Sequence, residues 1–181
     1  MYETLNILHD SRLIQRYDNL MYQLNTHKIP YKIWDAVECK ENVVKSINLS
    51  HKQIVQYAKD NGLKEICIGE DDIIFTSDNA WKYFLDNKPE SFDLYLAATF
   101  CPPNSGLVCG FHLYVISEKF YDKFLSTPDD VHIDTYMDEL KGDYHFCHPY
   151  PALQRGGEWS TNNRAVVNYS SLINEEDIYR G

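Results

Sequence analysis

Apolar residues follow two different periods along the chain. Short apolar runs, typical of β-strands, alternate with longer stretches in which apolar side chains recur every three or four residues, as on one face of a helix. The short runs predict strands at residues 4–8, 31–37, 65–68, 93–98, 107–117 and, within an aromatic segment, 144–151. The longer stretches predict helices at residues 12–24, 51–62, 78–87, 118–126 and 133–140.

Residues that favour helix boundaries and loops stand between these segments. A serine precedes four of the predicted helices, where its hydroxyl can cap a free backbone N–H group. These serines are Ser11, Ser50, Ser77 and Ser117. Residues 101–106 contain two prolines and a glycine and predict a loop.

Strands that alternate with helices require crossover connections, and these favour parallel pairing. We therefore expect an α/β fold, a single domain with a mostly parallel sheet flanked by helices. This domain would span residues 1–174, and the polar, acidic residues 175–181 would form a C-terminal tail. In such sheets, ligands bind at the carboxyl ends of the strands.

Three consecutive carboxylates, Glu70, Asp71 and Asp72, follow the predicted strand at residues 65–68. A solvated acidic loop is one interpretation of this triplet. Because the triplet stands at a strand end, a cation site is another. In extended backbone Glu70 and Asp72 point to the same side, where they could bind a hard divalent cation. Asp71 would point away and could support the fold by accepting backbone or Arg hydrogen bonds.

Other residues at strand ends and loops could serve the same site. Arg12 and Arg16 follow the first strand, where they could bind a phosphate or a nucleobase or be surface charges. Trp34 ends the second strand, and its ring could stack on a base or be buried in the core. His148, with His145 as its competitor, could complete a metal site.

Composition narrows the possible functions. The 181-residue chain has a formal net charge of −10, and no cluster of basic residues offsets it. General nucleic-acid binding is therefore not expected, because phosphate backbones are bound by cations. The sequence begins without a basic and then apolar leader pattern, and no run approaches the roughly 20 apolar residues of a membrane span. We therefore predict no membrane span.

The five cysteines form no C-x-x-C pair and are odd in number. They therefore predict neither a disulfide framework nor a zinc ribbon, and a reducing, cytoplasmic location fits them best. The alternative is an interaction domain stabilised by zinc, with four possible ligands. These are Cys101, Cys109, Cys147 and His148.

Five segments, in order along the chain, resemble blocks of glycosyltransferase family 25, the lipopolysaccharide and collagen glycosyltransferases. Residues 50–75, SHKQIVQYAKDNGLKEICIGEDDIIF, are similar to its central helix, strand and E-D-D signature. Residues 5–37, LNILHDSRLIQRYDNLMYQLNTHKIPYKIWDAV, resemble its first strand, Arg-bearing helix and second strand. GFHLYVIS, HIDTYM and HPYPALQRGGEWS, which begin at residues 110, 132 and 148, resemble its later blocks.

The resemblance implies an A-type nucleotide-sugar transferase fold. It also implies inverting transfer of a sugar from a nucleoside-diphosphate sugar to a hydroxyl acceptor, such as a glycan or lipopolysaccharide. Manganese or magnesium would be held by Glu70 and Asp72, with His148. Asp134 would be the catalytic base that inversion needs, and Gln154 would bind the acceptor. The donor-binding candidates are Arg12, Arg16, Trp34 and Asp71.

Several positions depart from the family pattern. His9 stands where an acidic residue is usual. His132 and Ile133 replace the Pro-Val that precedes the family's Asp. Thr161 replaces the usual Asp after the closing Ser. The alternative function is therefore a catalytically degenerate, transferase-like domain that binds a nucleotide or a protein.

Overall fold

Six strands form the central sheet of the chain, in the order β2-β1-β3-β6-β5-β7. The computed structural model describes residues 4–101, 108–160, 165–168 and 172–181. Five of the strands run in one direction and β6 runs in the other. The strands are β1 (Leu5–His9), β2 (Tyr31–Asp35), β3 (Glu65–Glu70), β5 (Leu94–Leu96), β6 (Leu113–Ser117) and β7 (Tyr144–Phe146).

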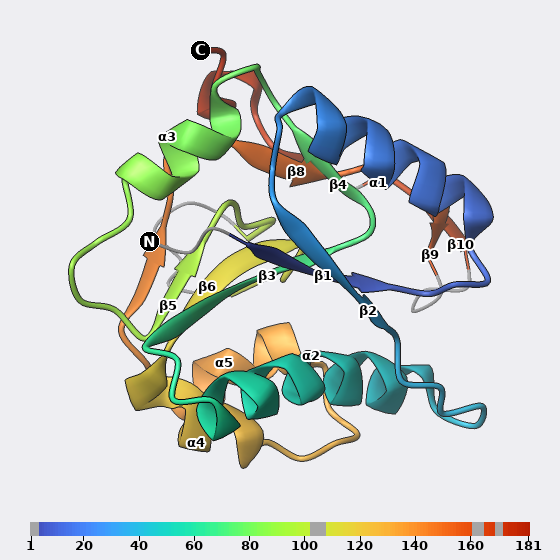
Figure 1. The fold of residues 1–181 in the computed structure, drawn as a ribbon, viewed down its shortest axis with the longest axis vertical. Coiled ribbons are helices and arrows are strands. Elements are labelled where there is room, and N and C mark those ends of the chain that lie inside the picture. The colour runs from blue at the N-terminus through green and yellow to red at the C-terminus, as the bar shows by residue number, and fades with distance from the viewer. Residues whose placement is uncertain (1–3, 102–107, 161–164, 169–171) are drawn as a thin grey trace.

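Helices cover both faces of this sheet, as Figure 1 shows. The helices of one layer are α1 (Ile14–Thr26) and α3 (Ala80–Asp86). The other layer contains α2 (Val43–Asp60), α4 (Tyr121–Leu125), which continues a short 3₁₀ turn at Glu118–Phe120, and α5 (Ile133–Leu140). The expected α/β class, a single domain with a mostly parallel sheet between helices, is confirmed.

Alternate residues of the strands face the two helical layers, because successive side chains of a strand point to opposite faces. In β6, Leu113 and Val115 pack in the cluster that contains residues of α1 and α3. Tyr114 and Ile116, between and beyond them, pack in the cluster that contains residues of α2, α4 and α5. The near-continuous apolar strands of the sequence therefore reflect a sheet that is buried on both faces.

The reversed direction of β6 was not anticipated from the sequence. Within the part of the chain that is described, no helix lies between β5 and β6. Without a helical crossover, consecutive strands pair antiparallel, and here Tyr95 lies opposite Val115. The predicted loop at residues 101–106 falls within this connection, and all of it beyond Cys101 is outside the described residues. Thr161 is also outside the described residues.

Two small sheets lie beside the central one. The first pairs β4 (Ile73–Phe75) with β8 (Ala152–Gln154), and the second pairs β9 (Glu158–Ser160) with β10 (Ala165–Val167). In the first, Ile73 lies opposite Gln154. Since Ile73 directly follows the acidic triplet, this pairing brings Gln154 to the triplet from far along the chain.

The predicted start of the second helix was wrong. Helix α2 begins at Val43 and not after Ser50, because the Asn42 side chain caps it by accepting a 3.0 Å hydrogen bond from the Lys45 backbone N–H. Ser50 lies inside the helix, where its hydroxyl donates to the Ser46 carbonyl (2.7 Å) and accepts from the Val37 N–H (2.8 Å). It therefore fastens the chain that enters α2.

The other predicted caps also differ from the structure. Helices α1 and α3 begin after Leu13 and Asn79, and neither has a side-chain cap hydrogen bond. Ser117 does precede the 3₁₀ turn before α4, but its hydroxyl donates to the Phe92 carbonyl at 2.7 Å. The hydroxyl is therefore bonded to a backbone carbonyl and does not cap the N–H groups at the start of the helical segment.

Residues 175–181 are packed against the domain, although we expected a tail. The Tyr150 N–H donates to the Asp177 carbonyl (2.7 Å), and the Tyr179 N–H donates back to the Tyr150 carbonyl (3.0 Å). The Tyr179 ring stacks on Tyr83 of α3 with a centroid distance of 3.9 Å. Tyr179, one of the few apolar or aromatic residues in this acidic segment, thus attaches the segment to the domain.

Cys101 and Cys109 form a disulfide, although the odd, unpaired cysteine pattern predicted none. The bond also removes two sulfurs from the zinc site considered above. Sequence spacing could not show it, because the pairing depends on where the fold places the two Cα atoms, which lie 5.7 Å apart. The remaining cysteines are Cys39, which is partly exposed, and the buried Cys67 and Cys147.

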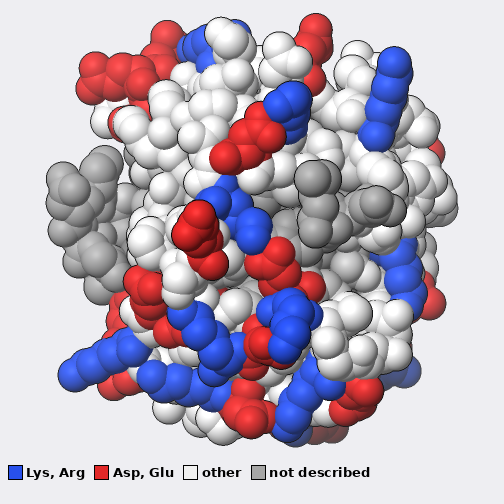
Figure 2. All heavy atoms as spheres, turned by 60° about the vertical axis from the view of Figure 1, so that its left-hand side comes forward, with Lys and Arg blue, Asp and Glu red and all other residues white. Residues whose placement is uncertain are grey.

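Acidic and basic side chains are interspersed on the face of the molecule shown in Figure 2. No continuous basic surface is visible on that face among the residues drawn in colour. Among the described helices, none is both long enough and apolar enough to cross a membrane.

Candidate functional site

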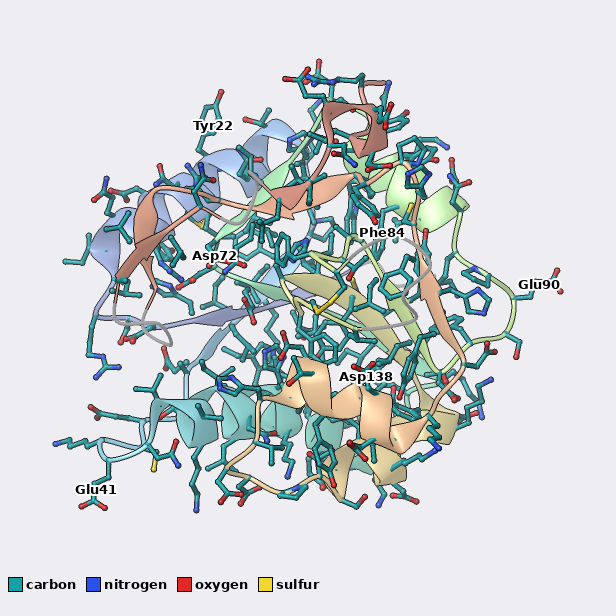
Figure 3. The ribbon with its side chains drawn as sticks, turned by 180° about the vertical axis from the view of Figure 1, so that it is seen from behind. Tyr22, Glu41, Asp72, Phe84, Glu90 and Asp138 are labelled. Carbon is teal, nitrogen blue, oxygen red and sulfur yellow. A yellow bond between two sulfur atoms is a disulfide. The ribbon has the colours of Figure 1, made fainter. Side chains whose placement is uncertain are left out.

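A cavity of about 570 Å³ lies where the carboxyl ends of β1 and β3 meet the starts of α1, α2 and α5. Its position agrees with the rule that open α/β sheets bind ligands at the carboxyl ends of their strands. Figure 3 shows that Asp72 lies in the interior, whereas Glu41 and Glu90 project outward. The polar lining includes His9, Arg12, Arg16, His51, Glu70, Asp71, Asp72, Asp134 and Gln154.

Asp71 is buried and joins the end of β3 to the connection between β1 and α1. One of its carboxylate oxygens lies 2.8 Å from Nδ1 of His9 and accepts a 3.3 Å bond from the Asp10 N–H. The other accepts a 2.8 Å bond from Arg16. These backbone and Arg contacts match the fold-supporting role considered for Asp71. They also explain why His9 is compatible with a position where the resembling family has an acid.

Asp72 is buried at 3% exposure and incompletely paired. Its Oδ2 accepts a 2.8 Å hydrogen bond from Gln154 and lies 3.3 Å from Arg16 Nη1. Its Oδ1 is buried without a hydrogen-bond partner in the described structure. Burial, followed by the charge of Glu70, raises the pKa of Asp72 to about 7 despite the opposing effect of Arg16. A buried orphan oxygen of this kind is unfavourable unless something binds it.

Glu70 is the last residue of β3, and its side chain is 26% exposed. Its Oε1 lies 3.1 Å from Nε2 of His51, a buried residue of α2. The other ring nitrogen of His51, Nδ1, lies 2.9 Å from the hydroxyl of Tyr114 in β6. Glu70 is thus held from the α2 side of the sheet, whereas Asp71 and Asp72 share Arg16 on the α1 side. The expectation that Asp71 points away from Glu70 and Asp72 was therefore wrong, because the strand ends at Glu70 and the next two residues form a turn.

Asp134 lies in the first turn of α5 and lines the same cavity. Its Oδ2 accepts a 2.9 Å bond from the Gly110 N–H, and its Oδ1 accepts a 2.8 Å bond from the Thr135 N–H. Gly110 has a φ of +101°, and a Cβ atom there would lie 2.6 Å from the Phe100 ring. Only glycine therefore fits where this backbone turns its N–H toward Asp134.

The two arginines have different surroundings. Arg16 is largely buried and contacts both Asp71 and Asp72, so its charge is partly neutralised within the acidic cluster. The Arg12 side chain is 62% exposed at the cavity, where it pairs with Asp10 at 2.6 Å and Glu38 at 2.8 Å. Arg12 can therefore exchange surface partners for a ligand at low cost.

Trp34 is not among the cavity-lining residues. Its indole N–H donates a 3.0 Å bond to Asn6, and its ring packs edge-on against Tyr57 at 5.1 Å. Lys32 places its ammonium 3.8 Å from the centre of the indole ring. The structure therefore places Trp34 at the sheet edge, where it is partly buried and packs against the core, so neither the base-stacking position nor full burial describes it.

His148 is also separate from the cavity, although we expected it to join the triplet. Its Nε2 lies 2.8 Å from Asp177 in the C-terminal segment. His145 pairs instead with Asp143 at 3.0 Å. Both histidines belong to the chain around β7, the edge strand, and β6 and β5 separate that edge from β3. The sequence does not reveal this distance because it does not give the strand order.

The described residues contain no group of three or more His, Cys, Asp or Glu side chains placed to hold a metal ion. Glu70 and Asp72 are therefore the candidates for a site with two protein ligands. Such a site suits Mg²⁺ or Mn²⁺, which commonly keep waters and take further oxygens from substrate phosphates. The unpartnered oxygen and the raised pKa of Asp72 both indicate a place where a bound cation would stabilise the carboxylate.

Sequence reasoning missed two parts of this site. Tyr114 reads as one more apolar strand residue, and only its position behind His51 makes its hydroxyl relevant. Gly110 was noticed only as part of a resembling block, and its contact with Asp134 depends on backbone conformation. A glycine directly before an aromatic strand residue was the available signal, because isolated glycines near strands mark bends and close approaches.

Comparison with known proteins connects this fold to glycosyltransferases. No protein family and no curated protein matches the sequence. One solved structure, a glycosyltransferase involved in the glycosylation of the major capsid of PBCV-1, is 10% identical and has a TM-score of 0.52. The match covers 79% of this chain and 80% of that one.

A second solved structure is a mutant of Drosophila β1,4-galactosyltransferase 7 in complex with manganese, UDP-Gal and xylobiose. It is 13% identical with a TM-score of 0.44, and the match covers 92% of this chain and 71% of that one. At these identities the first likeness establishes a shared fold and nothing about substrate. The chain therefore has a fold that is found among glycosyltransferases.

Proposed function

We propose that this protein is a metal-dependent, inverting glycosyltransferase, related to the family 25 enzymes that its sequence resembles. It would transfer a sugar from a nucleoside-diphosphate sugar to a hydroxyl of a glycan, lipopolysaccharide or similar acceptor. The cytoplasmic location expected from the cysteines is not part of the proposal, because disulfides such as Cys101–Cys109 are rare in reducing compartments. One observation carries the proposal. Glu70 and the incompletely paired Asp72 line one cavity together with Asp134, at the ligand-binding end of a sheet shared with a glycosyltransferase.

Glu70 and Asp72 fit a hard divalent cation such as Mn²⁺ or Mg²⁺. They offer oxygen ligands, and Asp72 has a buried oxygen without a partner among the residues described. A cation bound there would supply Lewis-acid and electrostatic stabilisation for the departing nucleoside diphosphate. Gln154, through its bond to Asp72, orients that carboxylate. This contact favours a role beside the metal over the acceptor-binding role expected from the sequence.

Donor binding would use the side of the cavity formed by the ends of β1 and β2. Arg12 is exposed there and can meet a phosphate or a base. Arg16 and Asp71 contribute by fixing the acidic cluster, since they are bonded to each other. Neither His148 nor Trp34 enters this proposal, because both lie away from the cavity.

Asp134 would act as the general base. As the acceptor hydroxyl oxygen attacks the anomeric carbon, its proton passes to the Asp134 carboxylate, and the bond to the diphosphate oxygen breaks on the opposite face of the sugar. The backbone N–H groups of Gly110 and Thr135 hold this carboxylate in place. A carboxylate at a helix N-terminus is also stabilised by the helix dipole.

Donor hydrolysis provides the test. The protein should be incubated with a panel of nucleoside-diphosphate sugars and Mn²⁺, and release of the nucleoside diphosphate should be followed with and without EDTA. We expect slow, EDTA-sensitive hydrolysis of one donor even without the natural acceptor. Absence of hydrolysis and of sugar transfer with every donor would contradict the proposal.

The alternative is a catalytically degenerate domain that binds a nucleotide or a protein. One observation favours it: both oxygens of Asp134 already accept backbone hydrogen bonds, which is also what a purely structural helix-start carboxylate would do. This alternative predicts nucleotide binding without turnover. Transfer of sugar to any member of an acceptor library would rule it out.

A further inference from the structure

His51 is buried beneath Glu70, and both of its ring nitrogens have hydrogen-bond partners. Nε2 lies 3.1 Å from Glu70 Oε1 and Nδ1 lies 2.9 Å from the Tyr114 hydroxyl, while the imidazole itself is 1% exposed. The rings of Tyr114 and Phe111 pack beside it, with centroids 5.7 and 5.8 Å away. Buried polar groups with complete bonding are well suited to fixing the orientation of their neighbours.

The chemistry of Glu70, His51 and Tyr114 determines which atom donates and which accepts in each of these two hydrogen bonds. An ionised carboxylate only accepts hydrogen bonds, so Nε2 of His51 must carry the proton toward Glu70. In a neutral imidazole Nδ1 is then an acceptor, and the Tyr114 hydroxyl must donate to it. Burial raises the pKa of Tyr114 well above its ordinary value, so this phenol keeps its proton.

The other neutral tautomer would not satisfy these contacts. Nδ1–H would then face the Tyr114 hydroxyl, and the bare Nε2 would lie 3.1 Å from the Glu70 carboxylate, so that two acceptors would meet. A buried polar atom without a partner is costly. The geometry therefore favours the Nε2–H tautomer.

We propose that His51, held from its other side by Tyr114, acts as a positioning residue that donates to Glu70 and orients it for its ligand. Oε1 of Glu70 is occupied by His51, whereas Oε2 has no partner among the described residues and belongs to a side chain that lines the cavity. The metal-positioning part of this inference rests on the proposed function. Partners outside the first coordination sphere of a metal typically contribute tenfold to a hundredfold to its affinity.

The tautomer can be measured without any ligand. Long-range ¹H–¹⁵N correlation spectra of the metal-free protein at neutral pH report which ring nitrogen of each histidine is protonated, and the spectrum of His51→Gln assigns the His51 signals. We expect a protonated Nε2 and a bare Nδ1. A bare Nε2 with a protonated Nδ1 in the wild type would overturn the inference.

The positioning role is tested by Mn²⁺ affinity, measured by calorimetry on folded variants. His51→Leu should weaken binding by about tenfold or more, and His51→Gln, whose amide can still donate to Glu70, should recover most of the loss. Tyr114→Phe, which removes the bond to Nδ1, should weaken Mn²⁺ binding to a smaller extent than His51→Leu. Tyr121→Phe is its matched control, since the Tyr121 hydroxyl is also buried but has no partner among the described residues. It should leave Mn²⁺ affinity unchanged.

The outcomes separate this inference from the proposed function. Equal Mn²⁺ affinities for His51→Leu, His51→Gln and the wild type would overturn the positioning role while leaving metal-dependent transfer intact. If the wild type binds neither Mn²⁺ nor any donor, the proposed function fails, and the tautomer spectra alone then decide whether Nε2 of His51 donates to Glu70.

Discussion

The two ends of strand β3 carry the same residue type in opposite electrostatic settings. At its start, Glu65 accepts bonds of 2.8 and 2.9 Å from Lys88, and the two side chains are equally, partly exposed. At its end, Glu70 has only the neutral-capable His51 beside it and is followed by two more carboxylates. The first arrangement is a balanced, partly exposed ion pair, and the second gathers three carboxylates, of which Asp71 and Asp72 are buried.

This difference separates acidic residues that are compatible with a stable fold from acidic residues that oppose folding. A paired, half-exposed carboxylate costs little and contributes little. A buried carboxylate with an orphan oxygen opposes folding unless a ligand compensates it. The unfavourable end of β3 is also the end at which α/β sheets bind ligands, so we assign the excess charge to ligand binding.

The largest expected effect comes from Asp134. Replacing it by Asn removes the proposed base and keeps its size, although the single amide oxygen can accept only one of the two backbone N–H bonds. We expect kcat to fall by about 10²- to 10⁴-fold with donor affinity nearly unchanged. Asp138→Asn is the matched control, because Asp138 lies on the same helix, accepts a bond from the Val108 N–H and does not line the cavity. Equal kcat values for the two variants would exclude Asp134 as the base.

Asp72→Asn should have the next largest effect. The change removes one charge from the proposed cation site, so activity at fixed Mn²⁺ should fall by about tenfold to a hundredfold. Steady-state kinetics over a range of Mn²⁺ concentrations would show whether the loss is in metal affinity. Glu65→Gln, at the other end of the strand, should leave activity within about twofold of the wild type. Similar losses in both variants would erase the distinction between the two ends.

The raised pKa of Asp72 predicts how stability depends on pH in the metal-free protein. Its pKa is about 7 in the folded state against an ordinary value of 3.8. The protonated form therefore favours folding, and this contribution is complete below about pH 4 and is lost as the pH rises through about 7. Relative to Asp72→Asn, the wild type should lose on the order of 1–3 kcal/mol of unfolding free energy across that range.

Urea denaturation of both proteins in EDTA, at several pH values, measures this loss. The two stability curves should converge at low pH and separate toward pH 7.5, with Asp72→Asn the more stable. Curves that remain parallel would mean that folding does not raise the pKa of Asp72.

The smallest expected effect is at the start of β3. Glu65→Gln breaks a pair that is partly exposed, so the unfolding free energy should change by less than about 1 kcal/mol. The same urea experiment at neutral pH measures it. A larger loss of unfolding free energy would mean that the Glu65–Lys88 ion pair is a strong interaction, and the contrast between the two ends of β3 would weaken.

The hydrophobic pattern was sufficient to predict most of the sheet and several helices. Helix α5 has the predicted bounds, and β1, β2 and β3 agree with their predicted positions within a few residues. The pattern succeeded because buried strands and amphipathic helices have different periods. It did not predict the beginning of α2, because Asn42 and not Ser50 caps this helix and its first residues, Val43 and Val44, are β-branched and have low helix propensity.

The candidate site was only partly predictable. The local spacing of Glu70, Asp71 and Asp72 at a strand end gave the acidic cluster, because neighbours in sequence remain neighbours in space. His148 was misplaced because its distance from β3 depends on strand order, which one sequence does not contain. The partners that explain Asp72, namely Arg16 and Gln154, are separated from it by tens of residues, and their contacts arise only through the tertiary fold.

Calorimetric titration of the wild type with the nucleoside-diphosphate sugar panel tests the central claim most directly, in the presence of Mn²⁺ and again in EDTA. We predict that one donor binds with Mn²⁺ at least about tenfold more tightly than in EDTA, and that Asp72→Asn loses this difference while remaining folded. Failure of every donor to bind in both conditions, or a donor affinity that is independent of metal in the wild type, would contradict the account.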